Sequence, residues 1–150
     1  MKRDRVWAVV MNAVRARIVR DTEERSGVRD LVVRAKQRHL RDMMADRPGR
    51  SFSSAGPRRS AMEYGSDPVR EDMRAFAAEV VARLEEHRLA GDFDHLAVVA
   101  TPQMLGILRP ALTEGVRRIV VKETAKDLVS LPDAELKAAI RTILRPGATA

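Results

Sequence analysis

Two apolar runs that lie far apart in the sequence limit the folds open to this chain more than any other feature. They are Val6–Met11, with three valines and a tryptophan, and His95–Ala100, which reads HLAVVA. Short runs without apolar–polar alternation are typical of strands that are buried on both faces. Such strands lie inside a sheet that helices cover on both sides. The two runs therefore predict an α/β protein.

The segments around these runs predict the rest of the sheet. Residues 14–20 alternate between apolar and basic except at Val19, and they predict a second strand. Residues 28–36 predict a third strand with Leu31, Val32 and Val33 at its centre, and a last strand is expected at 118–122. Turns at Asn12-Ala13 and at Gly27 join the first three strands into an antiparallel meander. Right-handed crossovers are compatible with a fourth strand parallel to the first. The expected fold is a ribonuclease-H-like five-stranded mixed sheet of order 3-2-1-4-5, with helices on both faces.

Prolines mark the helix starts. Asp67-Pro68 opens a helix of about 22 residues that ends at Gly91, because aspartate caps free amides and proline needs no N–H at the first helical position. Thr101-Pro102 repeats the pattern, and Pro110 is expected to interrupt that second helix. A C-terminal helix starts at residues 132–133. The length of 150 residues predicts a single domain over 1–145 and a frayed tail at 146–150.

The net charge of +7 and a pI of about 10.7 favour an anionic partner such as nucleic acid or another polyphosphate. The surplus is uneven, since the first fifty residues carry 14 basic and 7 acidic groups. A GC-rich genome that uses arginine in place of lysine is the alternative explanation, and 23 arginines against 5 lysines fit it.

One long segment, residues 46–67, follows neither helical nor strand periodicity and is rich in glycine, serine and arginine. Loops of this length in compact domains are usually functional or disordered. Arginines, hydroxyls and backbone amides together can hold phosphate oxygens, and the segment ends at a helix N-terminus. The predicted phosphate or RNA contacts are Arg47, Gly49, Arg50, Ser51, Ser53, Gly56, Arg58 and Arg59. A solvated loop without a ligand is the alternative.

A second predicted basic place follows the last strand, at Lys122 and Lys126. Open α/β sheets bind ligands at the carboxyl ends of their strands, so these lysines are further candidates for phosphate or RNA contacts. A salt-bridged turn that caps the sheet is an equally good interpretation of the same residues.

The residues favour a non-enzymatic protein, although catalysis stays open. A nuclease of this fold class needs carboxylates on its central strands, and neither apolar run contains one. The chain has no cysteine, no histidines at metal-ligand spacing, no Gly-x-Ser-x-Gly elbow and no P-loop. We therefore predict no catalytic residue, no metal site and no cofactor.

The start of the chain places basic residues before a short apolar run that ends at Asn12. This run is too short for the core of a signal peptide, and no stretch approaches membrane-spanning length. We therefore expect a cytoplasmic protein without a membrane partner. The sequence leaves the oligomeric state open.

Four segments together resemble a known family. DRPGRSFSSAG at 46–56, the SDP helix start at 66–68, VVATPQMLGILR at 98–109 and KETAKDLVSLPDAEL at 122–136 are similar to the bacterial "host attachment protein" family, named for attachment to host cells. That family is similar in fold to the middle domain of archaeal and eukaryotic class-one peptide release factors, and is grouped with ribosome-associated proteins.

The resemblance implies that the 46–67 loop approaches ribosomal RNA, because the Gly-Gly-Gln loop of release factors occupies the same place before a long helix. This chain has no Gly-Gly-Gln, so peptidyl-tRNA hydrolysis is not implied. The leading hypothesis is a non-enzymatic RNA- or ribosome-binding factor in rescue, hibernation or quality control. The alternatives are a binder or enzyme for a small phosphorylated ligand, and an attachment or signalling protein that acts through protein contacts.

Overall fold

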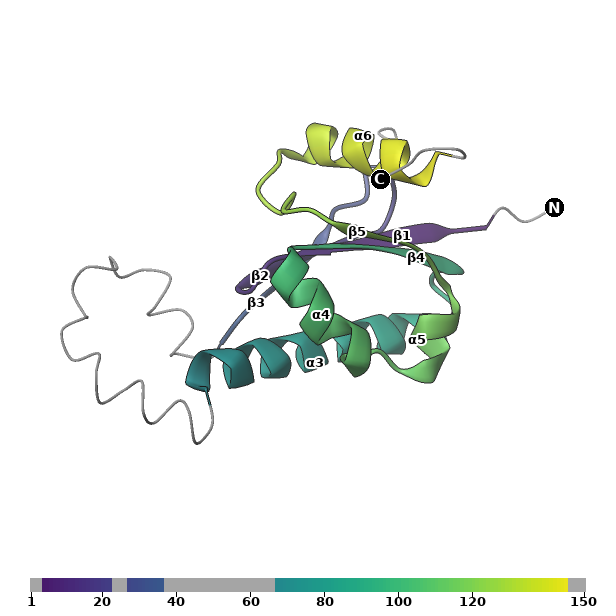
Figure 1. Cartoon of the computed structure of the whole chain (residues 1–150). Helices are drawn as coiled ribbons and strands as arrows, with labels where there is room; N and C mark the ends of the chain where they lie inside the picture. The colour runs from purple at the N-terminus through teal and green to yellow at the C-terminus, as the bar shows by residue number, and fades with distance from the viewer. Residues whose placement is uncertain (1–3, 23–26, 37–66, 146–150) are drawn as a thin grey trace.

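The computed structural model describes residues 4–22, 27–36 and 67–145, which form one mixed sheet with helices on both sides (Figure 1). β2 is antiparallel to β1 and to β3, whereas β4 is parallel to β1 and β5 is parallel to β4. The order β3-β2-β1-β4-β5 and the mixed character of the sheet confirm the predicted fold. The strands are β1 (Val6–Met11), β2 (Arg15–Val19), β3 (Leu31–Arg34), β4 (His95–Ala100) and β5 (Val120–Ala125).

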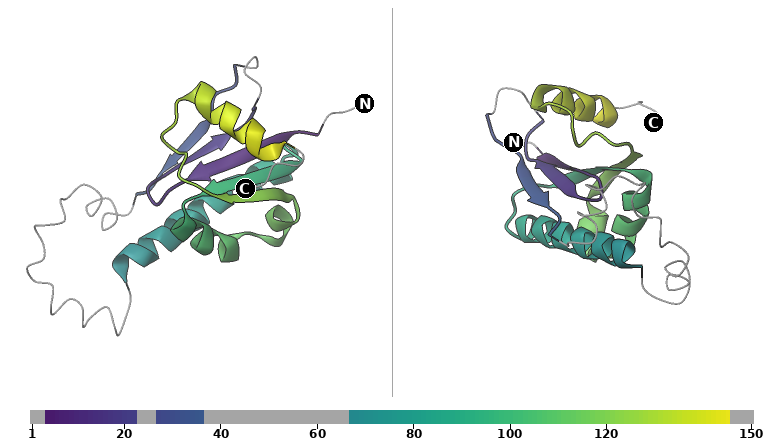
Figure 2. Two further views of the ribbon diagram at one scale, coloured as in Figure 1. Left: turned by 45° about the horizontal axis from the view of Figure 1, so that its top comes forward. Right: turned by 90° about the vertical axis from the view of Figure 1, so that its left-hand side faces the viewer.

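The helices of the described ranges divide between the two faces of the sheet. Figures 1 and 2 show α3, α4 and α5 on one side, here called the α3 face, and α6 alone on the other, the α6 face. One helix covers less of a sheet than three, so the α6 face has room for an open surface. The helices are α3 (Pro68–Leu89), α4 (Pro102–Ala111), α5 (Glu114–Arg118) and α6 (Asp133–Leu144).

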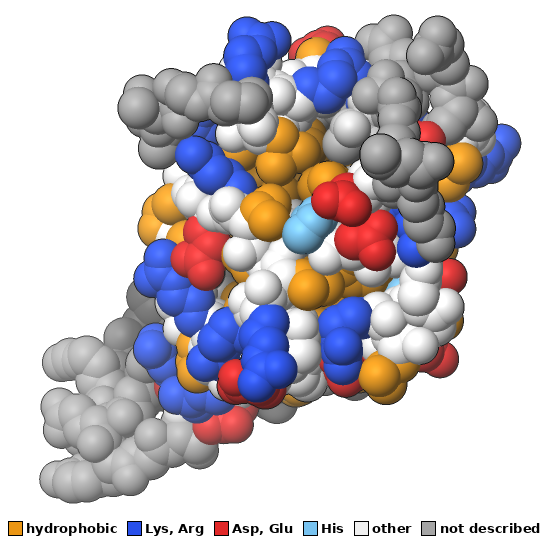
Figure 3. All heavy atoms as spheres, turned by 90° about the vertical axis from the view of Figure 1, so that its right-hand side faces the viewer, with side chains coloured by type: hydrophobic (Ala, Val, Ile, Leu, Met, Phe, Trp, Pro, Cys, Tyr) orange, Lys and Arg blue, Asp and Glu red, His pale blue; other side chains and the backbone are white. Residues whose placement is uncertain are grey.

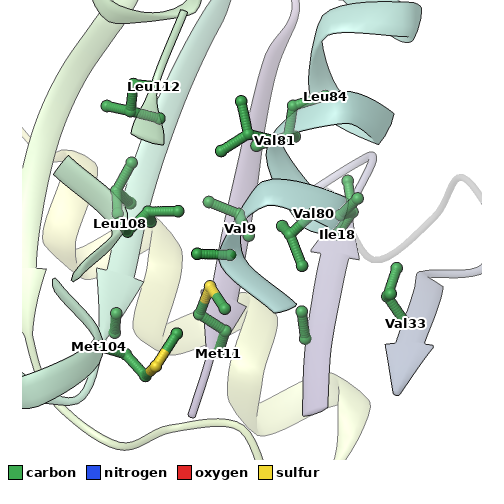
Figure 4. Close-up of a cluster of buried hydrophobic side chains, with 14 of the residues drawn as sticks. Val9, Met11, Ile18, Val33, Val80, Val81, Leu84, Met104, Leu108 and Leu112 are labelled. Carbon is green, nitrogen blue, oxygen red and sulfur yellow. The ribbon is translucent and has the colours of Figure 1, made fainter. Parts of the chain in front are cut away.

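The continuous apolar runs are explained by two separate cores. Trp7, Val9 and Met11 of β1 belong to the core on the α3 face, whereas Ala8 and Val10 belong to the core under α6. Because successive strand residues point to opposite faces, a strand between two cores must be apolar at every position. Figure 4 shows part of the larger core, where side chains of β1, β2 and β3 point toward α3 and α4.

The helix α3 begins and ends where the sequence predicts. Asp67 Oδ1 accepts hydrogen bonds from the amides of Val69 and Arg70, at 3.1 and 3.3 Å. Gly91 follows the helix with a φ of 79°, a left-handed conformation that glycine adopts without strain. A buried stripe that includes Phe76 faces the sheet.

A polar joint fastens the second half of α3 to α5. Arg88 donates to Glu85 at 2.9 and 2.8 Å, and the hydroxyl of Thr113 donates to Glu85 at 2.9 Å. The hydrogen bonds from Arg88 lower the pKa of the Glu85 carboxyl, loss of hydration opposes that shift, and Thr113 adds to it. The joint fixes the part of α3 that carries Arg83.

Two local expectations differ from the structure. Pro110 lies inside α4, one residue before its end. A proline lacks the backbone N–H and so removes one helical hydrogen bond, but at this position no helical turn follows that it could disrupt. Arg118 belongs to α5 and not to the last strand, because Thr113 caps a short helix by accepting from the amide of Val116 at 3.1 Å. The last strand therefore begins at Val120.

Candidate functional site

Most of the site predicted from the sequence lies outside the described residues. This holds for Arg47, Gly49, Arg50, Ser51, Ser53, Gly56, Arg58 and Arg59, and also for the predicted tail at 146–150. For these loop residues the assignment of phosphate contacts stays a prediction. Only Lys122 and Lys126 of the predicted contacts can be placed.

Lys122 and Lys126 lie at the β5 edge of the sheet. Lys122 is half-buried and aligned with Ala97, whose side chain packs in the core under α6. Lys126 is exposed just past the strand, and its amide donates to the carbonyl of Ala100 at 2.9 Å. On the other face of β5, Glu123 accepts from Arg109 at 2.8 Å. The two lysines therefore lie at the edge opposite β3, beside an ion-paired strand.

The β3 edge brings together arginines that the sequence did not single out. In the antiparallel pairing of β2 with β3, Arg15 lies directly opposite Arg34, and Arg17 lies directly opposite Val32. Arg17 is also aligned with Val10, whose side chain belongs to the core under α6. All four of these strand residues therefore point to the α6 face.

The facing arginines differ in their partners. Arg15 donates to the carbonyl of Val129 at 2.8 Å and to the hydroxyl of Ser130 at 3.4 Å. Arg34 is exposed, and among the described residues its side chain has no hydrogen bond or ion pair. Like charges directly opposite each other on neighbouring strands destabilise a sheet. The Arg15–Arg34 pair is therefore expected to reduce the stability of the fold, and it leaves the charge of Arg34 available to a ligand.

Two open hollows meet at this pair, one of about 980 Å³ and one of about 630 Å³. They share four lining residues, Arg15, Val32, Arg34 and Ser130. We call the two hollows together the β3 groove. The larger hollow also reaches Lys36, Glu79 and Arg83, and the smaller one reaches Arg17, Arg29, Asp30 and Asp133.

Arg17 lines the smaller hollow of the groove, and hydrogen bonds hold its side chain in place. Only 7% of this residue is exposed, and its guanidinium donates to Asp30 at 3.1 Å and to Asp133 at 2.6 Å. It also donates to the carbonyls of Val129 and Leu131, at 3.0 and 2.5 Å. These bonds hold the connection between β5 and α6 against the sheet. Since its donors are engaged, Arg17 positions the wall of the groove and is not a free cation.

The groove has a positive excess outside this network. Two of its three acids, Asp30 and Asp133, bind Arg17, and the third, Glu79, lies 3.6 Å from the ammonium of Lys36. The side chains of Arg29 and Arg83, like that of Arg34, are exposed and have no partner within the described ranges. Arginines of this kind are suited to phosphate and carboxylate groups.

A third hollow, lined by Val6, Trp7, His87 and Asp92 among others, lies at the start of β1. Figure 3 shows one face of the molecule, on which a histidine lies beside acidic and hydrophobic side chains. The Nδ1 atom of His87 is 2.7 Å from a carboxylate oxygen of Asp92, and Trp7 stacks on Phe93 with ring centres 4.7 Å apart. These contacts close the end of α3. No group of three metal-ligating side chains occurs in the part of the chain that the structure describes.

The fold and the groove define an α/β protein with a mixed sheet and an arginine-lined hollow at one edge. The sequence model of the family described as "Protein required for attachment to host cells" matches residues 7–140. This chain belongs to that family. Among the described helices, none has the length and apolar character needed to span a bilayer.

One curated relative is similar over part of the chain. A segment of 55 residues, 35% of this chain, is 44% identical to a protein of Rickettsia prowazekii (strain Madrid E) named "Uncharacterized protein RP470". The match covers 37% of that protein's length. This similarity supports kinship with that protein and assigns no activity to either chain.

Proposed function

We propose that this protein is a non-enzymatic RNA- or ribosome-binding factor that holds phosphate groups in the β3 groove. The observation that carries the proposal is the Arg15–Arg34 pair, where two arginines lie directly opposite each other on neighbouring strands and one lacks a partner among the described residues. A phosphate group between them replaces repulsion by two charge-assisted contacts. Phosphate contacts supply affinity with little sequence preference, which suits binding to folded RNA.

Two further features support this function. Lys36 and Arg83 extend the cationic surface from the end of β3 to α3. The family that the sequence resembles is similar in fold to the middle domain of class-one peptide release factors, and this also favours a ribosomal partner, in rescue, hibernation or quality control. The arginines of 46–67 would add to such binding, and their role stays a prediction.

The test compares variants from the two edges of the sheet. Replacing both Arg34 and Arg83 with alanine should weaken RNA binding and reduce the slope of log affinity against log salt by roughly 1.4 to 1.8, if each arginine reaches one phosphate. The matched control replaces Arg109 and Arg118, which are paired with Glu123 and Glu114 at 2.8 and 3.3 Å. That control removes the same charge and should leave the slope unchanged.

Co-sedimentation with ribosomes gives a second measurement on the same proteins. The unmodified chain should sediment with ribosomes at low salt and leave them at high salt, and the groove variant should leave at a lower salt concentration. Equal behaviour of the groove variant and its control, or absence of RNA binding by the unmodified chain, would contradict the proposal.

A small phosphorylated ligand is the second candidate, because about 980 Å³ is within the usual size range of ligand pockets. A thermal-shift screen with nucleotides tests it, and a saturable rise in melting temperature would support it. The family description also names attachment to host cells, for which secretion and adhesion assays are the direct measurements.

A further inference from the structure

We infer that the β3 groove takes a run of consecutive phosphates of one RNA strand, not an isolated phosphate or a mononucleotide. This inference rests on the proposed function and narrows its ligand to a continuous phosphodiester backbone that follows the β3 edge of the sheet. It depends on three features: the adjacency of the two hollows, the spread of the cations along them, and an exposed apolar side chain between those cations.

The two hollows are adjacent, because Arg15 and Arg34, together with Val32 and Ser130, line both of them. The shared residues come from β2, from β3 and from the connection that Arg17 holds in place. A ligand in one hollow therefore contacts residues that also line the other, and the Arg15–Arg34 pair lies at the junction.

Cations lie at both ends of this groove: the side chains of Arg29 and Arg83 have no partner among the described residues, and Lys36 lies 3.6 Å from Glu79. Arg29 precedes β3 and lines only the smaller hollow, whereas Lys36 and Arg83 line only the larger one. The four residues of β3 span roughly 10 Å, at about 3.3 Å per residue. Arg29 and Lys36 lie beyond opposite ends of that strand, and Arg83 lies on α3. One phosphate group is therefore too small to contact Arg29 and the Lys36–Arg83 group together. A polymer with regularly spaced phosphates can reach all three places.

Val32 lies between the two groups of cations, and its side chain is unusually open for an apolar residue on a strand, at 48% exposure. An alternation of cation, apolar side chain and cation matches a backbone in which phosphates alternate with less polar sugars. A mononucleotide would contact one hollow and leave the other cation group unused.

The decisive variant is Val32→Glu, which places a carboxylate between the cation groups at an exposed position. Its matched control is Val121→Glu on β5, the other edge strand, where the side chain is 51% exposed. The probes are labelled oligouridylates of two, six and twelve nucleotides and uridine monophosphate. Val32→Glu should weaken binding of the twelve-nucleotide probe at least about tenfold, because like charges oppose the phosphates, and Val121→Glu should not. Thermal melts verify that both variants are folded.

Variants of the two ends test the length of the contact. With the twelve-nucleotide probe, Arg29→Ala should reduce the salt slope by about 0.7, and Lys36→Ala with Arg83→Ala by about 1.4, and the two reductions should add. Arg29→Ala keeps the backbone carbonyl that accepts from Arg20, so the local fold is preserved. The dinucleotide is too short to reach both ends of the groove. Its affinity should therefore change either in the Arg29 variant or in the variant of Lys36 and Arg83, but not in both.

The outcomes separate this inference from the proposed function. If RNA binds and only one end matters for the twelve-nucleotide probe, or if the monophosphate binds as tightly as that probe, the extended backbone is wrong and phosphate binding stands. An affinity equal in Val32→Glu and Val121→Glu also overturns the inference alone. If no RNA binds and variants of Arg34 change nothing, both are wrong.

Discussion

The two edges of the sheet carry basic residues in opposite ways. At the β5 edge, Arg109 of α4 is paired with Glu123 of β5, and Arg118 is paired with Glu114 within α5. At the β3 edge, Arg34 faces another arginine and has no acidic partner among the described residues. The comparison shows that basic residues near an edge of the sheet do not by themselves form a free cationic surface. Near β5 an acid of the adjoining strand or of the same helix balances each of these arginines, whereas at the β3 edge the register sets Arg34 opposite another arginine.

The largest expected effect is a difference in stability between variants of two arginines, Arg17 near the β3 edge and Arg109 at the β5 edge. Replacing Arg17 with leucine should lower the free energy of unfolding by about 3–5 kcal/mol. It leaves Asp30, whose side chain is only 10% exposed, without its partner, and it removes two bonds to the β5–α6 connection. Arg109→Leu should change stability by less than about 1 kcal/mol, since its pair with Glu123 is largely exposed. Urea unfolding of both variants measures the difference.

A conservative variant tests whether the bonds of Arg17, and not its size, hold the connection. Arg17→Lys keeps the charge and loses the planar set of donors, so it should be destabilised nearly as much as Arg17→Leu. If both variants unfold at the same urea concentration as the unmodified chain, the bonds of Arg17 do not hold the β5–α6 connection in place. The proposed difference in stability between Arg17 and the arginines of the β5 edge is then wrong.

The fold was predictable because its signals are local. The apolar runs of β1 and β4 each reflect burial between two cores, and Asp67-Pro68 combines a cap with a residue that fits the first helical turn. The end of α4 was not predictable in the same way. A proline near a helix terminus has a small effect, so the sequence alone does not show whether the helix ends before or after Pro110.

The groove was not predictable from the sequence, although part of its signal was present. The alternation of Arg15 and Arg17 with apolar residues places both on one face of a strand. What the sequence did not reveal is the register across residues 20–30, which decides that Arg34 lies opposite Arg15. A shift of one residue would turn every side chain of β3 to the other face. The same limit applies to Arg83, which reaches the groove from a distant helix.

A smaller effect is expected from β5. The hydroxyl of Thr124 is buried, with 5% of the residue exposed, and is the one side-chain polar atom of the described residues found buried without a hydrogen-bond partner. Replacing it with valine, which has nearly the same shape, should raise the free energy of unfolding by about 1 kcal/mol, because the penalty of an unsatisfied buried group is removed. Urea unfolding measures it. A loss of stability would show that the hydroxyl is hydrogen-bonded in solution.

The smallest expected change in stability bears most directly on the comparison of the edges. Arg34→Glu places a carboxylate directly opposite Arg15, so it replaces a repulsive cross-strand pair by an attractive one. Such pairs contribute roughly 0.2–1 kcal/mol, so the variant should be slightly more stable than the unmodified chain. At the same time its RNA affinity should fall more than that of Arg34→Ala, because the new charge repels phosphate.

Opposite signs for stability and binding are what distinguish a functional arginine from a structural one. Arg34→Gln removes the repulsion without adding an attraction, so its stability should lie between those of the unmodified chain and Arg34→Glu. The differences should shrink in about 1 M salt, where the screening length falls to about 3 Å. Urea unfolding at low and high salt, together with RNA titrations, provides both readouts. If Arg34→Glu is less stable than the unmodified chain, Arg34 has a structural partner, and the β3 edge resembles the balanced β5 edge after all.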